Sequence, residues 1–169
     1  MEFILPDYAL FPPFYTIQLI DKTRDYQLQL WLDLILKYCK FINKPILTVS
    51  EFLNLKIFEN EQLKRKMNEQ GKILIKNYMM KKKKIIQHEK YDKLFIEFKS
   101  LTEWGNELFE YGNSKGLIGQ SLTFYSIQND ENSIFYNMDE MLLLLAYNSI
   151  KDSKKIKLVG NPGQFGLFW

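Results

Sequence analysis

One order of hydrophobic patterns occurs twice along the chain, and it constrains the fold more than any other feature. Helical spacing of apolar residues alternates with short β-branched stretches in both halves. The first series predicts a helix at 23–42, a strand at 46–49, helices at 50–53, 60–67 and 73–82, and strands at 85–86 and 94–98. The second predicts a helix at 103–111, a strand at 121–123, helices at 124–127 and 139–149, and strands at 156–159 and 165–169. Helix, strand, helix, helix and hairpin is the order of a winged helix.

We therefore expect a mostly α protein with small β-hairpins (α+β), built from two tandem winged-helix domains at 21–99 and 100–169. Charge supports two units with different surfaces. Residues 1–99 hold 18 Lys and Arg against 12 Asp and Glu, a net of +6, whereas residues 100–169 hold 5 against 8, a net of −3. An asymmetry of this kind does not indicate a protein that coats nucleic acid along its whole length.

Residues 1–20 form a separate segment in which prolines stand beside aromatic residues. Proline fixes φ and favours extended geometry in the residue before it, so the segment is predicted to run as an extended or polyproline II chain. We expect its rings to be exposed in the free chain and to fill pockets of a partner. The predicted partner-binding residues are Pro6, Tyr8, Phe11, Pro12, Pro13, Phe14 and Tyr15. The alternative is a tail that folds back onto the first domain.

No residue pattern predicts an enzyme, a metal site or a cofactor site. The chain has one cysteine and one histidine, which excludes a disulfide framework and leaves few ligands for a metal. His88 falls in a charged link, where we expect it to be solvated, and Cys39 falls in the apolar stripe of the first helix. The proline-broken N-terminus does not resemble a signal peptide, and no stretch is long and apolar enough to span a bilayer. A cytoplasmic protein is the expectation.

The run from Lys81 to Lys84 offers a second possible function. The third helix of a winged helix often enters the DNA major groove, where lysines neutralise phosphates. However, that helix offers only Lys76 and Asn77 for reading bases, and its counterpart at 139–149 is acidic at its start. A DNA-binding transcriptional regulator is therefore the alternative, and a basic helix end leading into an exposed wing is the simpler explanation.

The N-terminal motif closely resembles that of a known family. The residues that carry the resemblance are Phe11-Pro12-Pro13-Phe14-Tyr15-Thr16-Ile17-Gln18, Thr23-Arg24, Gln27-Leu28 and Trp31, then Tyr38-Cys39-Lys40, Ile57-Phe58-Glu59-Asn60, Leu63-Lys64-Arg65, Trp104 with Leu108, Leu122-Thr123-Phe124-Tyr125 and Phe135. In this order they resemble the vacuolar protein sorting 25 family, the small subunit of the endosomal sorting complex ESCRT-II. Leu5-Pro6-Asp7-Tyr8 resembles a degenerate first copy of the family's Pro-Pro-x-Tyr motif.

The resemblance implies a non-catalytic adaptor. The proline-aromatic segment would dock on the winged helices of the two larger ESCRT-II subunits, with two copies of this chain per complex. The second winged helix would engage the subunit that initiates ESCRT-III assembly, in the sorting of ubiquitinated membrane proteins into multivesicular bodies. The protein would be recruited from the cytoplasm to endosomal membranes with only indirect membrane contact, and no nucleic acid partner is implied.

Overall fold

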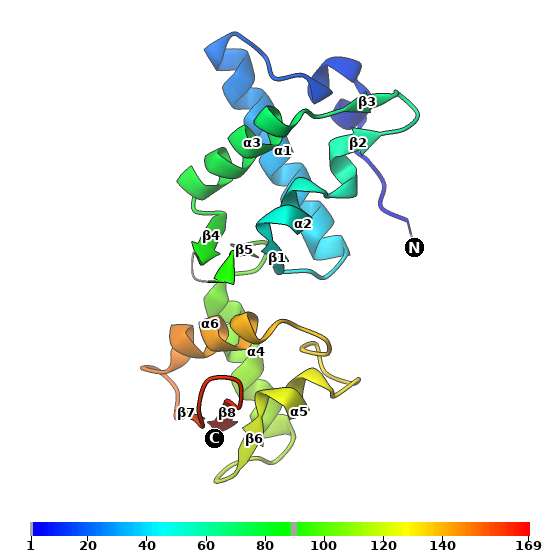
Figure 1. Ribbon diagram of the computed structural model, residues 1–169. Helices are drawn as coiled ribbons and strands as arrows, with labels where there is room; N and C mark the ends of the chain where they lie inside the picture. The colour runs from blue at the N-terminus through cyan, green and yellow to red at the C-terminus, as the bar shows by residue number, and fades with distance from the viewer. Residues whose placement is uncertain (1, 89–90) are drawn as a thin grey trace. The chain divides into compact units, whose positions relative to one another are not determined.

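The computed structural model describes residues 2–88 and 91–169 and divides the chain into two compact units, Met1–Phe98 and Lys99–Trp169 (Figure 1). We call these the first unit and the second unit. Each contains helices that pack beside a small antiparallel sheet.

The first unit begins with two 3-10 helices and continues with a three-stranded sheet and its helices. Its elements are η1 (Asp7–Leu10), η2 (Pro12–Tyr15), α1 (Asp21–Phe41), β1 (Ile46–Thr48), α2 (Val49–Leu53), η3 (Lys56–Phe58), β2 (Glu59–Asn60), β3 (Arg65–Lys66), α3 (Glu69–Lys81), β4 (Ile85–His88) and β5 (Lys93–Ile96). The sheet has the strand order β1-β5-β4, with Leu47 opposite Leu94 and Ile86 opposite Phe95.

The second unit repeats the helices and three-stranded sheet of this plan, without the 3-10 helices or the two-stranded hairpin among its described residues. Its elements are α4 (Leu101–Ser114), β6 (Ser121–Thr123), α5 (Phe124–Gln128), α6 (Glu140–Ile150), β7 (Lys157–Val159) and β8 (Gly166–Phe168). The strand order β6-β8-β7 places the last strand between the other two, as in the first unit. The predicted fold class, a mixture of helices and small hairpins in winged-helix order, is confirmed.

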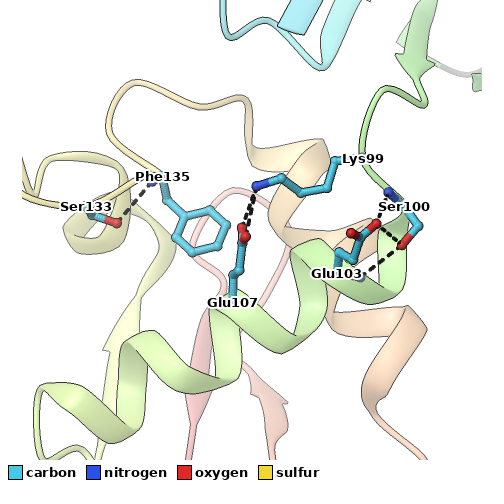
Figure 2. Close-up of polar contacts among 6 residues, drawn as sticks. All are labelled: Lys99, Ser100, Glu103, Glu107, Ser133 and Phe135. Carbon is cyan, nitrogen blue, oxygen red and sulfur yellow. Dashed lines mark hydrogen bonds and ion pairs between the residues drawn. The ribbon is translucent and has the colours of Figure 1, made fainter. Parts of the chain in front are cut away.

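Side-chain caps explain where several helices begin. Figure 2 shows the start of α4, where the Ser100 hydroxyl accepts the Glu103 N–H (3.2 Å) and the Glu103 carboxylate accepts the Ser100 N–H (2.9 Å). The neighbouring Lys99 donates to both carboxylate oxygens of Glu107 (2.7 and 3.0 Å) and lies 3.8 Å from the centroid of the Trp104 ring. A reciprocal cap of this kind satisfies two backbone donors that the helix leaves free, and the ion pair attaches the preceding residue to the same helix.

Three helices end in the same left-handed turn. After α3, Lys83 has φ +57°, its N–H donates to Met80 O, and the N–H of Lys84 reaches back to Met79 O, both at 2.9 Å. Asn43 after α1 and Gly116 after α4 hold the equivalent positions. Glycine and asparagine tolerate this backbone conformation, so the lysine is the unusual occupant.

Each unit has its own buried core. In the first unit, Trp31, Leu34, Ile35 and Cys39 of α1 are fully buried, and burial raises the pKa of the Cys39 thiol to about 12. In the second, Trp104 and Leu108 of α4 lie out of solvent, as do Phe135 and Leu142 and Leu143 of α6. Gly112 of α4 contacts the Trp169 ring so closely that an added Cβ would lie 2.0 Å from it.

The predicted helix at 60–67 is wrong. Residues 59–66 form the two-stranded β2–β3 hairpin, with Asn60 opposite Arg65. The Asn60 side chain accepts the N–H of Leu63 (3.0 Å), and Lys64 adopts φ +51°. Because asparagine offers the backbone a turn in place of the helical ladder, and the polar stretch has little apolar surface to bury, the turn is favoured.

The expectation of a solvated His88 is also wrong. His88 is the last residue of β4 and is half-buried, and its ring lies 4.8 Å from that of Tyr91. Glu89 and Lys90 of the predicted charged link lie outside the described residues. Strand β4 continues through His88 because the backbone of His88 pairs with Lys93 on β5.

Within residues 2–88 and 91–169, no helix combines the length and the hydropathy needed to cross a membrane. The same residues contain no group of three or more potential metal-ligating side chains.

Candidate functional site: two partner-binding surfaces

The proline-aromatic segment folds as two consecutive 3-10 turns. The Ala9 N–H donates to Pro6 O in η1, and the Phe14 N–H donates to Phe11 O in η2, both at 2.9 Å. The predicted extended or polyproline II chain is therefore wrong for these residues. Pro12 opens η2 because its fixed φ suits the first position of a helical turn as well as it suits an extended chain.

Phe14 and Tyr15 are buried against α1, with 5% and 3% of their surface exposed. The Phe14 ring stacks on Trp31 with centroids 4.3 Å apart and planes 10° from parallel, and Tyr15 meets the same indole edge-on at 5.6 Å. The prediction that both rings are exposed in the free chain is wrong. Trp31 supplies an apolar face within reach of the segment. Packing the two rings on this face removes apolar surface from water that would stay hydrated if the rings were exposed.

Side chains of α1 hold the backbone of the segment. The Gln27 amide donates to Phe14 O and Thr16 O (2.9 Å each) and accepts the Gln18 N–H (3.1 Å). Trp31 Nε1 donates to Phe14 O (3.2 Å). Since Gln27 is itself buried, these bonds satisfy a polar group that would otherwise be costly to bury.

A second group of bonds joins η1 to the β2–β3 hairpin. Ala9 O accepts the Tyr15 hydroxyl (3.1 Å) and the Asn60 side-chain amide (3.3 Å). Burial is the main reason that the pKa of Tyr15 lies above its ordinary value. Gln27 and Asn60 were named from the sequence only as part of the family resemblance, with no role in holding this segment. A glutamine within the apolar stripe of a helix is a signal that such a bond is needed.

The remaining predicted residues face outward to different degrees. Phe11 is 62% exposed, Pro13 is exposed, and Pro6, Tyr8 and Pro12 are half-buried. Tyr8, Phe11 and Pro13, together with exposed Tyr26 of α1, line a hollow of about 380 Å³ whose walls are mainly apolar, and Pro6 and Pro12 lie outside its lining. We call the surface formed by Pro6, Tyr8, Phe11, Pro12, Pro13 and Tyr26 the N-terminal surface.

A larger hollow lies in the second unit. It has a volume of about 780 Å³ and is lined by apolar and aromatic side chains together with four lysines, Asn113 and Asp152. The apolar residues are Phe109, Ile118, Tyr147, Ile156, Phe168 and Trp169, and the lysines are Lys151, Lys154, Lys155 and Lys157. We call it the C-terminal hollow. An apolar lining with four lysines against one aspartate suits an amphipathic segment that carries acidic residues.

Comparison with protein families matches residues 8–141 to the model described as ESCRT-II complex subunit. The chain is 29% identical over 170 residues to vacuolar protein-sorting-associated protein 25 of Drosophila melanogaster, covering 98% of this chain and 97% of that protein. It is 28% identical over 163 residues to the human protein of the same name, covering 94% and 93%.

Solved structures share the fold over almost the whole chain. The crystal structure of subunit VPS25 of the endosomal trafficking complex ESCRT-II aligns with a TM-score of 0.83 at 25% identity, over 98% of both chains. A chain in the crystal structure of the endosomal complex ESCRT-II (VPS22/VPS25/VPS36) aligns with a TM-score of 0.81 at 24% identity, over 97% of this chain and 98% of that one.

Proposed function

Since the chain belongs to the family of ESCRT-II complex subunits, we propose that it is the adaptor that joins the larger ESCRT-II subunits to ESCRT-III in multivesicular body sorting of ubiquitinated membrane proteins. The resemblance drawn from the sequence is confirmed, and the DNA-binding alternative is not favoured. In this role the protein is non-catalytic, needs no cofactor, and reaches endosomal membranes as part of the complex.

The N-terminal surface is the proposed contact with the larger subunits. One solved ESCRT-II complex contains VPS22 and VPS36 beside VPS25, and by analogy two copies of this chain would bind the winged helices of the larger subunits. The observation that supports the site is the exposure of Phe11 over an apolar hollow whose shape is set by buried Phe14. A rigid backbone and an exposed ring favour binding because little ordering entropy remains to be lost.

Replacing Phe11 with alanine tests this contact. We expect binding to the co-purified larger subunits to weaken by roughly thirtyfold, on the order of 2 kcal/mol, because an exposed aromatic anchor is lost. Thermal unfolding of the free chain should be unchanged. Tyr125→Ala, at an exposed aromatic residue of the second unit, is the matched control and should bind normally. Equal binding by Phe11→Ala and the wild type would contradict the assignment.

The C-terminal hollow is the proposed contact with the subunit that initiates ESCRT-III assembly. Reversing charge at Lys154 and Lys155 should weaken that contact about tenfold or more and make it less sensitive to salt, because rim charges steer association. Lys37→Glu, at an exposed lysine of α1, is the control. If the double variant and the control behave alike, the hollow is not the docking site.

A further inference from the structure

Residues 70–88 contain six lysines and no acidic residue. This stretch covers most of α3, the turn after it and β4. Two of the lysines have ion-pair partners elsewhere: Lys72 pairs with Glu69 (2.6 Å) and Lys84 with Glu97 (3.6 Å). Lys81, Lys82 and Lys83 are exposed, and among the described residues they form no ion pair. Among the described residues, the turn after α3 therefore concentrates lysines that no carboxylate pairs with, and the Lys82 ammonium lies 5.4 Å from the centroid of the Tyr78 ring.

Exposed apolar side chains lie next to this charge. Ile73 and Leu74 of α3 are partly exposed, at 45% and 37%, and Ile86 of β4 is 44% exposed. Ile73 and Lys81 are eight residues apart, slightly more than two turns, so they lie on one side of α3. The opposite side buries Ile75 and Met79 in the core. The outward side of α3 thus combines aliphatic and basic residues.

We propose that this surface, which we call the basic face (Ile73, Leu74, Lys81, Lys82, Lys83 and Ile86), binds an anionic membrane surface directly. Lysines attract acidic lipid headgroups, and aliphatic side chains beside them enter the boundary between headgroups and acyl chains. This goes beyond the proposed function, in which membrane contact runs through other subunits.

The composition of the basic face favours binding to an anionic bilayer over binding to DNA, the other polyanion that a winged helix could bind. A DNA groove is read by polar side chains that reach base edges, whereas the outward side of α3 presents Ile73 and Leu74. Burying these side chains against bases and phosphates gains little, but burying them at a lipid interface is favourable. The contact is peripheral, in line with the lack of a membrane-spanning helix among the described residues.

Vesicle flotation with the full-length chain tests the proposal. The wild type should bind vesicles of phosphatidylcholine with phosphatidylserine and should not bind phosphatidylcholine alone, and salt should weaken the binding. Replacing Lys81, Lys82 and Lys83 with glutamine should weaken it by about fivefold per lysine, about 100-fold in all. The matched control replaces three exposed lysines of α1, Lys22, Lys37 and Lys40, which changes net charge equally and should bind nearly as well as the wild type.

A second variant tests the aliphatic part of the face. Ile73→Gln should weaken vesicle binding severalfold without altering its dependence on salt, because it removes an apolar contact and no charge. The proposal is overturned if the wild type ignores phosphatidylserine, if the two lysine triples bind alike, or if Ile73→Gln binds as the wild type does. Tighter binding to duplex DNA than to the acidic vesicles, lost in the Lys81–Lys83 triple, would also overturn it by assigning the face to nucleic acid.

Discussion

Phe14 contributes more to the stability of the first unit than its place in a proline-rich segment indicates. It stacks on Trp31 and is almost fully buried. Phe14→Ala should lower the free energy of unfolding by about 3–5 kcal/mol, the usual cost of removing a buried phenylalanine. Urea unfolding of the free chain measures this change, and Phe11→Ala, at an exposed ring of the same segment, should leave stability nearly unchanged. Similar stability in the two variants would show that Phe14 is not part of the core.

Cys39 makes the stability of the first unit depend on alkaline pH. Its pKa is raised from an ordinary 9.0 to about 12 by burial, so above pH 9 the unfolded thiol ionises while the folded one stays protonated. The contribution of the protonated thiol to the free energy of unfolding is fully present below pH 9. It is lost as the pH rises toward 12, at roughly 1.4 kcal/mol per pH unit.

Unfolding of the wild type and of Cys39→Ala on both sides of pH 9 checks this expectation. The pKa values of Tyr8, Tyr15 and Tyr38 are also raised, chiefly by burial. Because these tyrosines titrate in both proteins, the difference between the two pH profiles reports on the thiol together with its effect on Tyr38. Parallel profiles would mean that Cys39 ionises equally in the folded and unfolded chain.

Single-residue burial was the least predictable property of the candidate site. Phe11 and Phe14 stand in one short motif and have the same side chain, yet one is exposed and the other is buried. The difference depends on Trp31, which lies 17 residues beyond Phe14, donates a hydrogen bond to its carbonyl oxygen and stacks on its ring. Local sequence predicts that aromatic anchors exist, but the choice between them depends on tertiary contacts.

At the scale of elements, predictions from periodic patterns were the most reliable. The long apolar stripes predicted α1, α4 and α6 to within a few residues at each end, because many positions contribute to each pattern. The short polar stretch at 60–67 has few such positions, and one asparagine side chain decides its structure. The 3-10 turns of the N-terminal segment were missed for a related reason, since proline suits both an extended chain and a helical first turn.

Glycine in place of Lys83 should stabilise the turn that ends α3. Lys83 holds a left-handed conformation that costs a side chain about 1 kcal/mol or more. Lys83→Gly should therefore raise the free energy of unfolding of the first unit by about 0.5–1 kcal/mol, after the greater freedom of glycine in the unfolded chain is subtracted. Asn43→Gly at the end of α1 is the control and should change stability less, because asparagine already tolerates the turn. A loss of stability in Lys83→Gly would contradict this account.

At the scale of the whole molecule, the second unit should fold when it is separated from the first. A fragment that begins at Lys99 keeps the ion pair to Glu107 and the cap at Ser100, and it should melt cooperatively. Truncation after Gly163 should abolish that transition. The truncation removes buried Leu167 and Trp169. The free energy of unfolding lost with them is comparable to the roughly 4–10 kcal/mol that stabilises a unit of this size. Circular dichroism melting of both fragments provides the measurement, and equal melting would show that β8 is dispensable.

The bonds that hold the first twenty residues also determine how proteases attack the chain. A protease must draw several residues into an extended strand, and for η2 this would break the bonds from Gln27 and Trp31 to Phe14 O. The turn at 160–164 is exposed at every residue, and its described backbone bond, from the Gln164 N–H to Asn161 O (2.8 Å), lies within the turn. Brief digestion of the native chain followed by mass spectrometry should therefore find the first cleavage in this turn, with Phe14 and Trp31 still on one fragment. We therefore expect a segment with the composition of a cleavable tail to resist proteolysis as a structured domain does.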